Sequence, residues 1–185
     1  MNYYGAKDLA DSFRTVRKNT ILIAEEIPED RYTFKAAPDT RTVAQLLTHI
    51  ASTPTMAEQI HAIEHRSTLE GFDFPGFMQR MTVEEQAPRS KAQIIATLRE
   101  NGERFAKWLE TQSDDFLAER VQYPASMPLP ARTRFEMLMG IKEHEMHHRG
   151  QLMLMERMLG IVPHLTRQMQ ERMATMTAAR TTASA

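Results

Sequence analysis

The sequence predicts an all-α protein built as a four-helix bundle. Segments with apolar residues three or four positions apart recur along the 185 residues, and most begin at a capping pattern or end at Gly or Pro. No run of four to eight residues alternates apolar and polar side chains with β-branched enrichment, so strand signals are nearly absent. Four long helices with both short and long connections are typical of a four-helix bundle.

The first two expected helices lie on either side of a loop that contains Pro38. The first spans residues 4–27 and ends at Pro28. The second opens at Thr42 and Gln45, whose side chains form a capping box that satisfies free backbone amides, and it runs to about residue 64.

The second helix contains a proline, which predicts a kink or a restart within it. Pro54 cannot donate a backbone hydrogen bond, and Thr53 is available as a new N-cap. His61 and His65 share i, i+4 spacing, but a helical wheel turns both away from His49. We therefore expect them at the surface.

The third and fourth expected helices also begin at capping boxes. Ser90 opens the third, which runs to about residue 111, and Thr133 opens the fourth, which runs to Leu159 and stops at Gly160. Residues 67–88 are expected to be a long packed connection with at most a short helical turn, and residues 113–131 an extended one.

The C-terminal segment is expected to form a separate extension. Leu165, Met169, Met173 and Met176 share one face, which predicts a short amphipathic helix at a dimer contact. The last seven residues are expected to be frayed. The sequence thus divides into a bundle over residues 1–163 and an extension over 164–185.

Charge and composition narrow the classes of partner. The chain has 23 basic and 24 acidic residues without a basic stripe, so we expect no nucleic-acid partner. No apolar run approaches the ~18 residues of a membrane span, and the N-terminus has no signal-peptide core. Cysteine is absent, which fits a cytoplasmic protein and excludes thiolate ligands.

The fourth helix carries the clearest chemical signal. Its inward stripe includes His144 and His148, which lie one turn apart and can direct two imidazoles at one metal ion. His49, on the shoulder of the apolar stripe of the second helix, is a candidate for a third ligand. Core histidines with ordinary hydrogen-bond partners are the alternative.

The same stretch, HEMHHRGQ, also fits the H-E-x-x-H pattern of zinc proteases, with Glu145 as general base. The metzincin version needs Gly and His where this chain has Gln151 and Leu154. Such proteases also usually hold the peptide on an edge strand, and none is expected here. The protease interpretation is therefore disfavoured, and the role of Glu145 stays open.

Two stretches, RTVAQLLTHIA at 41–51 and HEMHHRGQLMLMERMLGIVP at 144–163, resemble the DinB-like superfamily of damage-inducible and YfiT-like proteins. The resemblance covers residues 5–163 and implies an up-down-down-up bundle. It also implies a divalent metal ion, nickel or zinc, held by His49, His144 and His148. Gln45, Glu145 and Gln151 are candidate hydrogen-bond partners for the ligand rings.

The resemblance leaves three functions open. The first is a metal-dependent enzyme, a transferase that uses a low-molecular-weight thiol or a hydrolase, acting on a small molecule as a homodimer. The second is a non-catalytic metal-binding stress-response protein. The third is a metal-free helical interaction module that uses the Met-rich tail.

Overall fold

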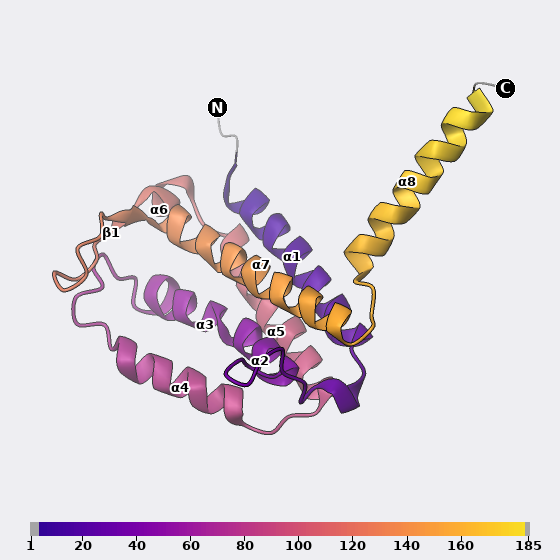
Figure 1. The fold of residues 1–185 in the computed structure, drawn as a ribbon. Coiled ribbons are helices and arrows are strands. Elements are labelled where there is room, and N and C mark those ends of the chain that lie inside the picture. Colours follow the sequence, from indigo (N-terminus) through magenta and orange to yellow (C-terminus); the bar gives the residue numbers. More distant parts are fainter. Residues whose placement is uncertain (1–3, 184–185) are drawn as a thin grey trace.

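Four long helical segments form the bundle, and the computed structural model describes residues 4–183 (Figure 1). They are α1 (Ala6–Glu26), α2 (Val43–Ser52) with its continuation, α5 (Lys91–Glu110) and α7 (Arg134–Met158). Helices α1 and α2 each pack against both α5 and α7. Helix α4 (Phe74–Gln86) packs along α2 and returns the chain, so that α5 runs parallel to α2 (Figure 1). The predicted up-down-down-up bundle is confirmed.

The expected helix ends follow local chemistry. The side chains of Thr42, Ser90 and Thr133 cap α2, α5 and α7, and each capping box is closed by the residue three positions on. Helix α7 ends just before Gly160, whose φ of 80° lies in the left-handed region that glycine adopts most easily. These four predictions are confirmed.

Both connections contain more regular structure than expected. Residues 67–88 include α4, whose N-cap Asp73 accepts a hydrogen bond from the Gly76 amide at 2.9 Å. Residues 113–131 include α6 (Asp114–Ala118) and β1 (Arg120–Val121), which pairs antiparallel with β2 (Arg132–Thr133). The predicted connections were wrong here because Gly and Pro at α4 and the shortness of α6 and the strands hide the periodicity.

The second helix restarts at Pro54, as predicted, and continues as α3 (Pro54–Ala57) and a π-helical turn, η2 (Glu58–Ile63). Thr53 does not cap the restart, because its hydroxyl donates to the His49 carbonyl at 2.8 Å. His61 lies within this π turn, which changes the angular phase of the helix. His61 is consequently buried and contacts Arg134 at 2.9 Å, so the prediction that it lies at the surface was wrong. His65 is exposed, as expected.

The apolar core is divided into two main clusters, one toward each end of the bundle. The first includes Ile23, Leu47, Ile50, Leu98 and Leu152, and the second includes Leu9, Phe13, Phe105, Leu109 and Leu138. Buried polar side chains lie between them along the bundle axis: Arg17, Thr48, His49, Glu145 and His148. This middle polar layer positions the candidate site.

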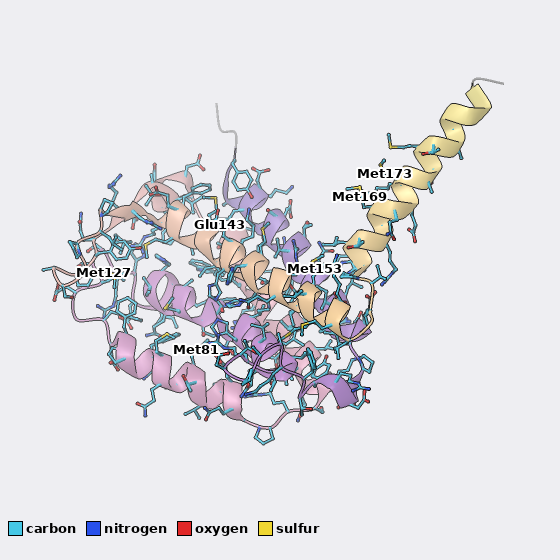
Figure 2. All side chains as sticks on the ribbon, viewed as in Figure 1. Met81, Met127, Glu143, Met153, Met169 and Met173 are labelled. Atoms are coloured by element: carbon cyan, nitrogen blue, oxygen red, sulfur yellow. The ribbon has the colours of Figure 1, made fainter. Side chains whose placement is uncertain are left out.

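Helix α8 (His164–Ala183) leaves the bundle and projects away from it (Figure 1). It is 20 residues long, longer than the short helix expected. Its base is anchored by His164, which is 4% exposed, whereas Met169 and Met173 extend from the projecting part (Figure 2). None of the helices described between residues 4 and 183 is long and apolar enough to cross a membrane.

Candidate metal centre

Three histidines from two helices meet in the middle polar layer. His49 lies in the last turns of α2, and His144 and His148 lie one turn apart on α7. The Nε2 atom of His144 is 2.8 Å from His49 Nε2 and 3.1 Å from His148 Nε2. The ligand atoms of all three lie within 4.8 Å of one another, and no other such group of His, Asp or Glu occurs in the part of the chain that the structure describes.

Two neighbouring side chains orient the rings of this group. His49 Nδ1 is 2.6 Å from Glu85 Oε1, and His148 Nδ1 is 2.8 Å from Gln151 Oε1. A carboxylate oxygen and an amide oxygen can only accept, so each Nδ1 carries the proton. The Nε2 lone pairs of His49 and His148 are therefore both directed toward His144 Nε2. This is the arrangement of a histidine metal ligand whose second nitrogen is held by an acceptor.

The donor set fits a divalent cation. Two nitrogens bound to one tetrahedral ion at ~2.1 Å would lie about 3.4 Å apart, slightly more than the separations between these rings. Imidazole suits zinc and nickel, and with cysteine absent no thiolate competes as a ligand. The three residues predicted as ligands are thus brought together, and their role as ligands is taken up below as a proposal.

Burial keeps the three rings neutral. It is the main cause that lowers the pKa of each, and it brings the pKa of His144 to about 4, with the neighbouring His148 and His49 adding to the effect. The Glu85 carboxylate opposes the shift at His49, and the Gln151 amide opposes it at His148. Neutral imidazole is the form that binds metals, so the site is ready for a cation at neutral pH.

Glu85 links the histidines to the guanidinium group of Arg41, which lies at the surface. Its second oxygen accepts from Arg41 Nε at 2.7 Å, while the first contacts His49. Only 10% of its side chain is exposed. The sequence prediction missed Glu85 because it assigned residues 67–88 to a connection. Asp73 as an N-cap with Pro75 in the first turn was the signal for the helix that carries it.

Glu145 is turned away from the histidines. It forms a buried ion pair with Arg17, whose Nε lies 3.0 Å from Oε1 and whose Nη2 lies 2.9 Å from Oε2. Arg17 also donates to the Leu98 and Ile50 carbonyls. Gly102 lies on α5, where an added Cβ would be 2.8 Å from Arg17 Cγ. Only glycine at this position leaves room for the Arg17 side chain. Glu145 is therefore a structural residue, and the protease interpretation fails.

Of the two other residues predicted to contact the ligand rings, only one does so. Gln151 holds His148, as expected. Gln45 does not reach a histidine, because its side chain accepts from the Thr42 amide at 2.9 Å in the capping box. His147, next to His148 on α7, is exposed; its ring lies edge-on to that of His148, and its Nε2 is 3.3 Å from the Gln151 amide nitrogen.

Two cavities adjoin the histidines on different sides. The larger, about 570 Å³, meets His148, and its lining includes several polar side chains: Asp39, Arg41, Gln45, Glu85 and Gln151. The smaller, about 320 Å³, meets His49 and His144. Both volumes are in the range of small-molecule sites, so the group is reachable from two directions.

The fold and the site together define an up-down-down-up helical bundle protein with a three-histidine group between its second and last bundle helices. The chain belongs to the DinB family, whose model matches residues 1–180. The resemblance inferred from the two sequence stretches is thus confirmed, and the match extends beyond residue 163 into α8. No curated protein is significantly similar to the chain.

Solved structures with the same fold are distant in sequence. A DinB-like protein from Bacillus subtilis is 22% identical over 82% of this chain and 92% of that one, with a TM-score of 0.58. YfiT from Bacillus subtilis, described as a probable metal-dependent hydrolase with an unusual four-helix bundle topology, is 16% identical over 84% and 88%, with a TM-score of 0.65.

A third similar structure is the colibactin self-resistance protein ClbS in complex with a dsDNA. It is 15% identical, with 85% of this chain and 98% of that chain covered and a TM-score of 0.61. At such identities the likeness shows the fold alone. The expectation that this chain has no nucleic-acid partner therefore stays a prediction.

Proposed function

We propose that this protein is a metal-dependent enzyme whose ion, nickel or zinc, is held by His49, His144 and His148. The observation that carries the proposal is the convergence of Nε2 atoms, with the Nδ1–H groups of His49 and His148 engaged by Glu85 and Gln151. Membership of the DinB family and the description of the similar YfiT structure as a probable metal-dependent hydrolase support it.

The bound ion would supply Lewis-acid activation of a thiol or a water, because three neutral imidazoles leave its charge uncompensated and a coordination position open. The chain's own residues orient and shield this site. Glu85 and Gln151 fix the rings of His49 and His148, and both rings are buried. The reaction would be a thiol-dependent transfer or a hydrolysis of a small molecule.

The cavities favour an enzyme over a non-catalytic metal-binding protein. A purely structural metal site is closed by protein ligands on all sides. Here two cavities, about 570 and 320 Å³, meet the histidines directly. Space for ligands on two sides of a three-ligand group is what a reaction with a substrate and a cosubstrate requires.

Metal analysis of the purified chain tests the site. We expect one nickel or zinc ion per chain, lost in His144→Ala because one of three ligands is removed. His65→Ala is the control, since His65 is exposed and contacts Glu119 and Phe116 rather than the three histidines. Equal metal content in wild type and His144→Ala would overturn the site.

A turnover assay separates the enzyme from the passive binder. Conjugation of a low-molecular-weight thiol with the electrophile 1-chloro-2,4-dinitrobenzene, and hydrolysis of a set of ester and amide substrates, should show activity that chelation removes and metal restores. A metal-loaded protein that is inactive across both panels would leave the non-catalytic interpretation in its place.

We also infer that two copies of the chain pair through α8. Met169, Met173 and Met176 are 56–63% exposed. Figure 2 shows the first two on the projecting helix. An exposed apolar face of this kind is typical of an interaction surface. Sedimentation should report a dimer that Met169→Glu with Met173→Glu converts to a monomer; a monomeric wild type would exclude this pairing.

A further inference from the structure

The smaller cavity beside the histidines is predominantly apolar. It measures about 320 Å³ and lies among α2, α3, α4, the β1–β2 hairpin and α7. Its wall includes His49 and His144, and its apolar side chains come from several elements: Met56, Phe77, Met78, Met81, Met137 and Ile141. Met81 lies on α4 (Figure 2), and Met137 and Ile141 line the same cavity from α7. The cavity therefore brings apolar surface directly to two of the three proposed ligands.

Gly140 keeps this cavity open. A Cβ added at Gly140 would meet no atom within 4 Å, although the residue lies in the interior of α7 and lines the cavity. Glycine is one of the least favourable residues in a helix interior. At Gly102 close packing against Arg17 explains the glycine, but no packing contact does so at Gly140. Its consequence is empty space one turn from His144.

The few charged groups in the wall balance one another. Arg132 and Glu136 contribute one charge of each sign, and Glu136 is already engaged by the Thr133 amide and hydroxyl at 2.7 and 2.9 Å. The other cavity, by contrast, contains Asp39, Arg41 and Glu85 and suits a polar molecule. A pocket without net charge and with a thioether-rich lining suits an uncharged apolar ligand of adaptable shape.

We propose that this methionine-lined pocket binds an uncharged, apolar small molecule, presents it to the His49–His144 side of the site, and has Gly140 as its size-determining residue. The role of that molecule as the substrate rests on the function proposed above. Its binding does not, because the pocket is formed by side chains of the bundle and the hairpin.

Fluorescence titration of the full-length protein with N-phenyl-1-naphthylamine, an uncharged apolar probe, tests the pocket. Gly140→Leu should weaken binding about ten-fold or more, because the new side chain fills the space. Gly150→Leu is the matched control: it lies on the same helix, is exposed, and likewise has no atom within 4 Å of an added Cβ. It should bind the probe like wild type.

A second variant and a second probe keep the test decisive. Met78 is 49% exposed, so Met78→Glu should fold normally, introduce charge into the wall and also weaken binding of the uncharged probe. The anionic probe 1-anilinonaphthalene-8-sulfonate should bind wild type more weakly than the uncharged one. Unchanged affinity in both Gly140→Leu and Met78→Glu would overturn the pocket, and preference for the anionic probe would overturn its assignment to uncharged ligands.

Metal content measured on the same samples separates this proposal from the one before it. Normal metal content in Gly140→Leu with lost probe binding supports the pocket as a distinct part of the site. Probe binding that survives in metal-free His144→Ala would show that the pocket stands even if the proposed metal chemistry fails.

Discussion

Glu145 and Glu156 lie on the same side of α7 but have opposite environments. They are 11 positions apart, about three helical turns, and both face α1. Glu145 is 2% exposed and Glu156 is 0% exposed. Glu145 is gripped by Arg17 of α1, whereas neither carboxylate oxygen of Glu156 has a hydrogen-bond partner.

The region around Glu156 shows what an absent partner does to a buried acid. Glu26 of α1 lies nearby with one unpaired oxygen, and His164 of α8 has an unpaired Nδ1. Arg167 is engaged by the other oxygen of Glu26. Burial, followed by the charge of Glu26, raises the pKa of Glu156 to about 7. Equal burial on one helix thus gives a fixed ion pair in one place and a titrating acid in the other.

Removing the partner from the first carboxylate should have the largest effect on folding. Glu145→Ala leaves the Arg17 guanidinium buried without its counter-charge, so we expect a loss of about 3–5 kcal/mol in the free energy of unfolding. Urea denaturation measures it. The double variant Arg17→Met, Glu145→Leu should recover most of the loss; a single variant as stable as wild type would show that the pair does not hold α1 against α7.

Removing the charge of Glu156, in contrast, should raise the free energy of unfolding at high pH. The folded pKa of about 7 lies above the ordinary 4.5. The contribution of Glu156 to stability is therefore fully present below pH 4.5 and is lost as pH rises through about 7. Glu156→Gln cannot ionise, so above pH 7 it should be more stable than wild type by about 3 kcal/mol.

The difference between the two unfolding curves isolates this residue from the other groups that titrate there, among them His164 beside Glu26 and Arg167. It should be small near pH 4.5, grow toward pH 7 and then level off. Parallel curves across this range would mean that Glu156 ionises normally in the folded chain, and that a partner compensates its burial.

The sequence could predict the features that local chemistry determines. Thr42, Ser90 and Thr133 begin helices because a hydroxyl accepts an amide three residues on, wherever the helix packs. His144 and His148 share a face because of helix geometry alone. For the same reason, short sequence patterns were enough to predict the helical bundle and two of the three site histidines.

Features that depend on another element could not be predicted. Glu145 and Glu156 look alike in sequence, and the position of Arg17 on α1 decides between them. His61 moved inside because the π turn altered the helical phase. Glu85 reaches His49 only because α4 folds back along α2. Pro75 and Gly76 at the start of α4 hide its helical periodicity in the sequence.

Glu85 is the third carboxylate to compare, because it is paired with both His49 and Arg41. Its removal should have the smallest effect on the stability of the fold but should clearly weaken metal binding. In Glu85→Ala, His49 loses the acceptor for its Nδ1–H, and the charge of Arg41 is left beside the histidines. We expect metal affinity to fall about 10- to 100-fold.

Competition with a chelator of known affinity measures the change. Glu84→Ala is the matched control, because Glu84 is exposed and contacts Arg89 instead of a histidine. Glu85→Gln should retain part of the affinity, since an amide oxygen still accepts from Nδ1–H, as Gln151 does at His148. Equal metal affinity in wild type, Glu85→Gln and Glu85→Ala would mean that His49 needs no acceptor to orient its ring. The ordering wild type, Gln, Ala would instead show that the orientation of the ring and the charge of Glu85 contribute separately to metal binding.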